Sequence, residues 1–141
     1  MYKRQGLLHL AHVGDSRCYL IRDGAILQIS EDHTVVQEML RAGLIEKDEI
    51  PKSPMRHYLS RSVGSDPEVP VDLLSMPVQA NDVFVLCSDG LVNVVREEEI
   101  RDAILDNFLR DAPRILVDLA NQRGGPDNIT VVVLAVNDTG E

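Results

Sequence analysis

The first thirty residues alternate between short apolar runs and polar turn sequences. Residues 7–13 (LLHLAHV) and 18–22 (CYLIR) have the pattern of strands separated by the turn GDSR, and residues 26–29 follow the Asp-Gly pair of RDGA. An Asp-Gly pair between two apolar runs is a strong hairpin signal. We therefore predict that residues 7–29 form an antiparallel meander of strands.

The next part of the chain changes to a helical period. Thr34 is a suitable N-cap for a helix that ends at Gly43, and IEKDEI at residues 45–50 predicts a second short helical piece stopped by Pro51. Residues 51–70 are rich in proline and predict an irregular segment. A long irregular segment within a compact domain is usually functional or mobile.

The second half of the chain predicts two strands, two helices and a final strand. Residues 71–76 and 83–87 predict a pair of strands around PVQAND. REEEIRDAILDN at residues 96–107 has the pattern of an amphipathic helix with acids in its first turn, and a further helix covers residues 111–122. The β-branched run ITVVVLAV at residues 129–136 predicts a strand that is buried on both faces.

Composition narrows the class of protein. The chain has 141 residues, which suits one compact domain or part of one, and its hydrophobic content of 44% is enough to build a core. No apolar run reaches the ~18 residues that a membrane span needs, so we expect no membrane segment in this chain. The formal charge of −9 argues against nucleic acid as a partner, because an acidic surface repels phosphate backbones.

Both cysteines, Cys18 and Cys87, lie in apolar, strand-like runs. Two separated thiols in such runs predict buried cysteines without a disulfide, hence a reducing compartment, which we take to be the cytoplasm. Residues 1–5 (MYKRQ) join no periodic pattern, and we expect a non-native or disordered start there. Residues 138–141 are expected to be a short tail.

Three aspartates, Asp15, Asp89 and Asp127, stand at the ends of apolar runs. Each has a glycine nearby, as Gly14 and Gly90 illustrate, and glycine lets a backbone turn sharply or approach another group closely. If the three strands are neighbours, their ends would bring the carboxylates together. Two such charges ~4 Å apart repel each other by about 4 kcal/mol at an effective dielectric constant near 20, unless a cation lies between them. The pattern therefore favours Mg²⁺ or Mn²⁺ and metal-activated attack by water on a phosphate ester.

Simpler roles for several polar residues stay open. Asp-Gly is a common turn pair, and Asp15 in GDSR could merely cap a hairpin. Ser88 lacks the flanking glycines of a GxSxG nucleophile elbow, which argues against a nucleophilic serine. His33 in EDHT stands before a helix start and predicts a polar loop residue, while His57 predicts a solvated side chain.

Five motifs occur here in an order that is specific to one family. HVGDSRCYLIRDG, SEDHT, SRSVG, VFVLCSDGL and GGPDNITVVV follow one another as in metal-dependent protein phosphatases of the 2C type, and the chain resembles a bacterial-style member from about Leu7 to Val136. The resemblance implies an α+β fold, an α-β-β-α sandwich of two antiparallel sheets with helices outside both. It places the metals in a cleft at one end of the sandwich.

The resemblance also implies roles for individual residues. Asp89 and Asp127 match aspartates that hold the second metal of a catalytic Mn²⁺ or Mg²⁺ pair, and Asp15 matches the aspartate for a third, weaker metal. Residues 32–64 match the flap beside the cleft. No side chain is expected to be the nucleophile, because water activated by the metals attacks. The residues expected to support the turns beside the ligands are Gly14, Gly90 and Asn128.

The chain also departs from the family pattern. The arginine that binds the substrate phosphate and the DGxGG-type motif, whose aspartate bridges the catalytic metals, are both missing. Asp23-Gly24 lies downstream of VGDSR and is not that motif in family order. Roughly the first third of a family domain is absent, so residues 6–137 match its C-terminal part. Unpaired sheet edges and exposed apolar faces are expected to follow.

The function implied by the resemblance is hydrolysis of phosphoserine or phosphothreonine in phosphorylated proteins. We expect this of the intact protein, and little or no activity of this chain alone. The alternative is a non-catalytic regulatory or scaffolding remnant that keeps the fold but not the reaction. A metal-binding structural domain without phosphate chemistry is a third option, and it predicts tight divalent-ion binding without ester turnover.

Overall fold

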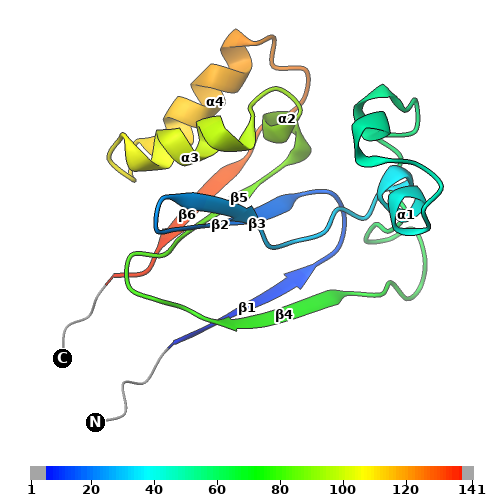
Figure 1. Cartoon of the computed structure of the whole chain (residues 1–141), viewed down its shortest axis with the longest axis horizontal. Coiled ribbons are helices and arrows are strands. Elements are labelled where there is room, and N and C mark those ends of the chain that lie inside the picture. The colour runs from blue at the N-terminus through cyan, green and yellow to red at the C-terminus, as the bar shows by residue number, and fades with distance from the viewer. Residues whose placement is uncertain (1–5, 138–141) are drawn as a thin grey trace. The chain divides into compact units, whose positions relative to one another are not determined.

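The computed structural model describes residues 6–137, which divide into two compact units (Figure 1). The sheet unit contains residues 16–30 and the residues from 75 onward, together with the start of the first strand. The loop unit contains His9–Asp15 and Glu31–Leu74.

An antiparallel sheet of four strands forms the centre of the sheet unit, in the order β3-β2-β5-β6. The strands are β2 (Arg17–Arg22), β3 (Ala25–Gln28), β5 (Val83–Cys87) and β6 (Val131–Ala135). Asp23 and Gly24 join β2 to β3 with φ angles of 52° and 75°, the left-handed pair that a type I′ turn requires. The Asp-Gly hairpin predicted from the sequence is confirmed.

Three helices lie on one face of this sheet (Figure 1): α2 (Asp89–Val92), α3 (Glu97–Leu105) and α4 (Ala112–Gln122). Apolar residues of α3 and α4 recur at helical spacing and face alternate residues of the strands. Fully buried side chains in this core include Tyr19, Val85, Leu91, Ile100 and Leu116. Each such side chain contributes about 1.5–3 kcal/mol of burial free energy, so this helix-covered face is the main core of the unit.

β6 differs from its prediction. Within the described chain it pairs only with β5, and its residues alternate between half-buried and exposed. Val132 and Leu134 are 47% and 48% exposed, so the prediction of a strand buried on both faces is wrong. A β-branched run has the same composition whether one face or both are covered, because the cover comes from distant parts of the chain.

A second antiparallel sheet is formed by β1 (Leu7–His12) and β4 (Asp72–Pro77). The predicted meander over residues 7–29 is therefore wrong at its first strand. Both edges of β2 are occupied, one by β3 and the other by β5, so no edge is left for β1. β4 and β5, which were predicted as a pair, also lie in different sheets. The α+β class with two antiparallel sheets and helices is confirmed.

The loop unit contains α1 (Val35–Arg41) and the 3₁₀ helix η1 (Lys47–Lys52). Thr34 caps α1 as predicted, since its hydroxyl accepts a hydrogen bond from the N–H of Gln37. Pro51 lies inside η1 and does not end it, because a proline is tolerated in so short a helix. The remaining segment is irregular, as the proline content predicted.

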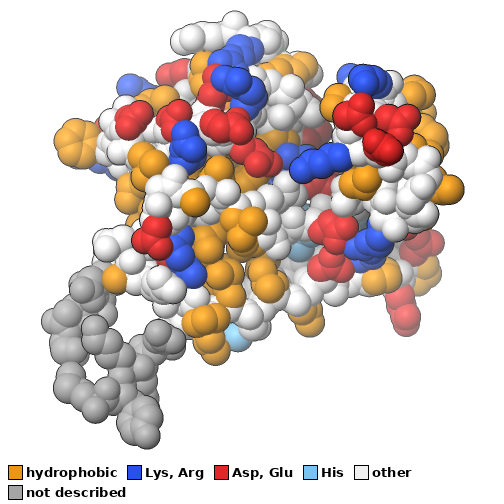
Figure 2. Space-filling view, in the orientation of Figure 1, with side chains coloured by type: hydrophobic (Ala, Val, Ile, Leu, Met, Phe, Trp, Pro, Cys, Tyr) orange, Lys and Arg blue, Asp and Glu red, His pale blue; other side chains and the backbone are white. Residues whose placement is uncertain are grey.

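Both cysteines are buried, whereas several large apolar side chains are exposed. Cys18 and Cys87 are buried and form no disulfide, as predicted, and burial raises the pKa of the Cys18 thiol to about 11. Figure 2 shows apolar side chains on the visible surface between charged ones, and Leu27 of β3 is among the exposed residues. No helix of residues 6–137 is long and apolar enough to cross a membrane. The expectations for residues 1–5 and 138–141 lie outside the described part.

Candidate metal centre

The buried strand β5 leads directly into Ser88 and Asp89. Ser88 has an extended backbone and is the N-cap of α2, and Asp89 is the first residue of that helix. An acidic side chain in the first turn of a helix is favourable, because it faces the partial positive charge of the helix N-terminus. Asp89 is half-buried. The apolar run therefore meets a carboxylate because the strand ends there and a helix begins.

Ser88 joins the start of α2 to the segment around Asp127. Its Oγ donates to the carbonyl oxygen of Asn128 at 3.1 Å and accepts from the N–H of Thr130 at 3.0 Å. The Ser88 N–H donates to the carbonyl of Thr130 at 3.1 Å. The Ser88 hydroxyl is thus engaged in structure, and the chain segments that carry Asp89 and Asp127 lie side by side.

Gly90 serves close approach and not a turn. It is the second residue of α2 and has no positive φ angle. A Cβ atom at this position would lie 2.3 Å from the carbonyl oxygen of Asn128. Only glycine lets these two backbones approach so closely.

Replacing Gly90 with alanine is expected to destabilise the fold by about 3 kcal/mol, the upper end for overpacking, because a backbone carbonyl must move to admit the methyl group. The measurement is the free energy of unfolding from urea denaturation. A loss below about 0.5 kcal/mol, the usual range for surface changes, would show that the Asn128 carbonyl moves away freely.

Asp127 lies in the loop between α4 and β6 and is exposed. Its Oδ1 accepts a hydrogen bond from the backbone N–H of Asn128 at 2.7 Å. Asn128 therefore contacts both neighbours through its main chain, with its N–H bound to Asp127 and its carbonyl bound to Ser88. The backbone of this loop is thereby joined to the N-cap residue of α2.

Arg123 anchors the end of α4 that leads into this loop. Its Nη1 and Nη2 donate to Glu99 of α3 at 2.8 and 2.6 Å, and Nη1 also donates to the carbonyl of Val94 at 2.7 Å. The Arg123 guanidinium holds the pKa of the Glu99 carboxyl well below its usual range, so this bidentate pair stays charged. The clamp fixes the position from which the loop with Asp127 departs.

Asp15 belongs to the loop unit and follows β1. Gly14 before it has a φ of 110°, in the left-handed region that favours glycine. The Gly14 N–H donates to Nδ1 of His33 at 3.1 Å, and its carbonyl accepts from the N–H of His33 at 2.8 Å. The segments that carry Asp89 and Asp127 are thus adjacent within the sheet unit, while Asp15 stands on a turn of the other unit.

Known proteins match nearly the whole chain. The family model described as Protein phosphatase 2C matches residues 1–39. The chain is 40% identical over 129 residues to the serine/threonine phosphatase stp of Listeria welshimeri. The aligned residues make up 91% of this chain and 51% of that protein. The solved structure of the serine/threonine phosphatase PstP of Mycobacterium tuberculosis matches with a TM-score of 0.88 and 39% identity, covering 93% of this chain and 55% of that one.

The chain carries part of a protein phosphatase 2C domain. It spans about half the length of the curated relatives it matches. A further solved structure, the catalytic domain of PstP in complex with 2 manganese ions, matches with a TM-score of 0.79 and 37% identity, over 98% of this chain and 56% of that one.

The residues of this phosphatase 2C segment suit a hard divalent cation in kind but not in number. Asp89 and Asp127 offer carboxylate oxygens, the ligands that Mg²⁺ and Mn²⁺ prefer. Among residues 6–137, no group of three or more His, Cys, Asp or Glu side chains is arranged to hold a metal ion. Because Mg²⁺ demands a near-ideal octahedral shell, the described chain supplies only part of a site.

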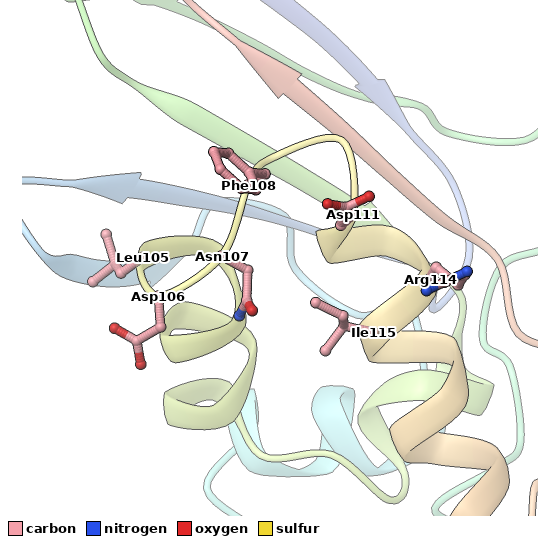
Figure 3. A pocket seen from close by; sticks show the side chains of 7 residues that line it. All are labelled: Leu105, Asp106, Asn107, Phe108, Asp111, Arg114 and Ile115. Atoms are coloured by element: carbon pink, nitrogen blue, oxygen red, sulfur yellow. The ribbon is translucent and has the colours of Figure 1, made fainter.

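A pocket beside α3 and α4 contains none of the predicted site residues (Figure 3). Its lining residues are Leu105, Asp106, Asn107, Phe108, Asp111, Arg114 and Ile115. Two carboxylates line it against one guanidinium, which disfavours an anionic phosphate. The pocket is therefore unsuited to a phosphate ester.

Sequence reasoning missed the structural roles of His33 and of the Glu99–Arg123 pair. His33 was predicted as a polar loop residue, but it is only 3% exposed and contacts Gly14 and Asp72. Glu99 was predicted only as one of the acids in a first helical turn. No local sequence pattern predicts either contact, because the two residues of each contact are about 20 or more positions apart. His57, in contrast, is exposed as predicted.

Proposed function

We propose that the protein to which this chain belongs hydrolyses phosphoserine and phosphothreonine in phosphorylated proteins. The observation that carries the proposal is the match over more than nine-tenths of the chain to relatives named as serine/threonine phosphatases. The adjacency of the segments bearing Asp89 and Asp127 supports it, because it is compatible with two carboxylates that share a metal ion. The cytoplasm is the compartment we propose, in keeping with two buried thiols outside any disulfide.

The metal ligands we propose are Asp89 and Asp127 for one ion of a Mn²⁺ or Mg²⁺ pair, and Asp15 with Asp89 for a third ion. This grouping rests on the resemblance of the motifs that carry the three aspartates. The manganese-bound structure of PstP shows that a relative with 37% identity takes that metal.

The chemistry we propose requires little reactivity from this chain's own side chains. Bound metal would supply an activated water and stabilise charge on the transferred phosphoryl group. Asp89 and Asp127 would hold the ion, and Ser88 and Asn128 would keep the two segments in register through the hydrogen bonds described above. Residues 32–64 would form the flap that influences substrate access.

The test is a phosphatase assay that compares this chain alone with a fusion protein in which a relative supplies the part of the domain that this chain does not match. The chain alone is expected to show little or no turnover of a phosphothreonine peptide in millimolar Mn²⁺. Fusion to the part of the Listeria welshimeri phosphatase that this chain does not match is expected to restore Mn²⁺-dependent turnover. No turnover in a folded fusion would contradict the proposal, and chelation of the metal with EDTA serves as the control.

A non-catalytic regulatory or scaffolding remnant is the second candidate. It is favoured by one observation, that residues 6–137 contain no group of three or more potential ligands arranged around an ion. This candidate predicts that the folded fusion binds phosphorylated peptides or partner proteins without turnover. The same assay therefore separates the two functions.

A further inference from the structure

His33 is the centre of a polar cluster within the loop unit. Its side chain is nearly inaccessible, with 3% of the residue exposed. Nδ1 accepts a hydrogen bond from the Gly14 N–H at 3.1 Å, and Nε2 lies 2.9 Å from Oδ2 of Asp72. Because Nδ1 must offer a lone pair to the amide, the proton of the neutral ring belongs on Nε2, where it is donated to Asp72.

Arg61 keeps Asp72 in the ionised state, in which its carboxylate can accept the hydrogen bond from His33. Nη1 of Arg61 donates to Oδ1 of Asp72 at 2.8 Å. The same Nη1 lies 3.3 Å from Nε2 of His33, but a protonated Nε2 cannot accept from it, so the guanidinium serves Asp72. The hydrogen bond from His33, with that from Arg61, lowers the pKa of the Asp72 carboxyl, which keeps it an acceptor.

The backbone of His33 repeats the connections of its side chain. Its N–H donates to the carbonyl of Gly14 at 2.8 Å, and its carbonyl accepts from the N–H of Ser60 at 2.9 Å. The Val35 N–H donates to the carbonyl of Tyr58 at 2.8 Å. Ser60 is therefore bonded to the same histidine that holds the Gly14 turn, and Tyr58 is bonded two residues further along the chain, to Val35.

A second histidine covers the ring. The centroid of the His12 ring lies 4.9 Å from that of His33, and Nε2 of His12 is 3.0 Å from the carbonyl oxygen of Glu31. Both nitrogens and one face of the His33 ring are thus engaged by separate parts of the loop unit. Such a residue has few ways to move, which suits a group that sets the geometry of its neighbours.

We propose that His33 is a positioning residue, which fixes the Gly14–Asp15 turn and so aims the Asp15 carboxylate. Two hydrogen bonds between His33 and Gly14, one in each direction, hold Gly14 in its left-handed conformation, and Asp15 is the next residue. The same histidine links this turn to Ser60 and, through Asp72, to Arg61, both in the segment proposed as the flap. The value of the aimed carboxylate as a metal ligand rests on the proposed function, whereas the control of the turn does not.

The two ring nitrogens can be tested separately, because asparagine and glutamine each replace one of them. His33→Asn places an oxygen near the position of Nδ1 and keeps an acceptor for the Gly14 N–H, whereas His33→Gln reaches toward Asp72 and leaves that N–H without its acceptor. His57→Gln is the matched control, since His57 is an exposed histidine of the same unit. The probe is NMR hydrogen exchange of backbone amides in the 141-residue chain.

His33→Gln is expected to speed exchange of the Gly14 amide about tenfold, the scale of one lost hydrogen bond, while His33→Asn and His57→Gln leave it nearly unchanged. Amides of β2 and β5 should keep their protection in all three variants. Unchanged exchange at Gly14 in His33→Gln would overturn the proposal. So would an equal acceleration throughout the chain, because that would mean a general loss of stability.

A second readout separates this proposal from the proposed function. Mn²⁺ broadens NMR signals near its binding site, and in the unmodified chain we expect broadening at Asp15. His33→Gln should raise the Mn²⁺ concentration needed for the same broadening about tenfold. This is a typical effect of disturbing a group that orients a metal ligand. Broadening at Asp15 that is unaltered by His33→Gln would overturn the aiming role. No broadening at Asp15 in the unmodified chain, with the Gly14 result as expected, would count against Asp15 as a ligand and leave the positioning role supported.

Discussion

Asp89→Asn in the active fusion protein is expected to lower phosphatase turnover by at least a hundredfold. Loss of one group that stabilises transition-state charge typically costs about 10²–10³-fold, and loss of a ligand that holds the metal should cost no less. Asparagine keeps the size of the side chain and its place at the start of α2, but it removes the charge that attracts the cation. The measurement is kcat and KM for a phosphothreonine peptide as a function of Mn²⁺ concentration.

The control for this experiment is Asp106→Asn. Asp106 follows the last residue of α3 and lies in the same unit as Asp89. Its replacement removes one carboxylate charge, as Asp89→Asn does, but leaves the segments around Asp89 unaltered. Its turnover should match that of the parent fusion. Added Mn²⁺ should partly restore the Asp89 variant, because a weakened site still fills at higher concentration. Unchanged kcat in a folded Asp89 variant would remove this residue from the proposed site.

Arg22→Met is expected to lower the free energy of unfolding by about 3 kcal/mol, because it leaves the charge of Asp82 buried without its partner. Asp82 is only 1% exposed, and Arg22 donates to its two oxygens from Nε at 2.7 Å and from Nη2 at 2.6 Å. The Gln79 N–H adds a third hydrogen bond at 2.7 Å. Urea denaturation at neutral pH measures the loss.

The matched control is Arg41→Met, which breaks an exposed ion pair with Glu31. Exposed pairs contribute about 0–1 kcal/mol, so this variant should lose little. The double variant Arg22→Met with Asp82→Asn should recover part of the stability, because no buried charge then remains. If Arg22→Met lost no more than Arg41→Met, the buried pair would have no stabilising role.

The pH dependence of this effect follows from the pKa of Asp82. Hydrogen bonds from Arg22 lower that pKa more than any other cause, and burial opposes them. A carboxyl with a depressed pKa in the folded state contributes stability above its unfolded pKa of about 3.9, and this contribution is lost as pH falls through the folded value. The difference between the parent chain and Arg22→Met should therefore shrink below about pH 4.

Local signals in the sequence predicted local structure. The hairpin at Asp23-Gly24, the capping of α1 by Thr34 and the left-handed Gly43 all follow from the preferences of a few adjacent residues. Helices α3 and α4 follow from apolar spacing in the same way. These features needed no knowledge of the rest of the chain.

Partners distant in sequence were predicted less well. The strand at Leu7–His12 has the right pattern for a strand, but its partner is β4 and not β2. The run at Val131–Ala135 was expected to be buried on both faces and is instead an edge strand. Strand pairing depends on which edges are free and on what covers each face, and neither is written in the strand itself.

The sequence by itself determined the family, through five motifs in order. It also predicted Asp15, Asp89 and Asp127 as candidate metal ligands. Only the tertiary structure decided which segments meet: Ser88 with Asn128, Glu99 with Arg123, and His33 with Gly14. The reason is physical. A motif reports the residue types that a site needs, whereas the hydrogen bonds that aim them join segments whose approach is set by the packing of the whole chain.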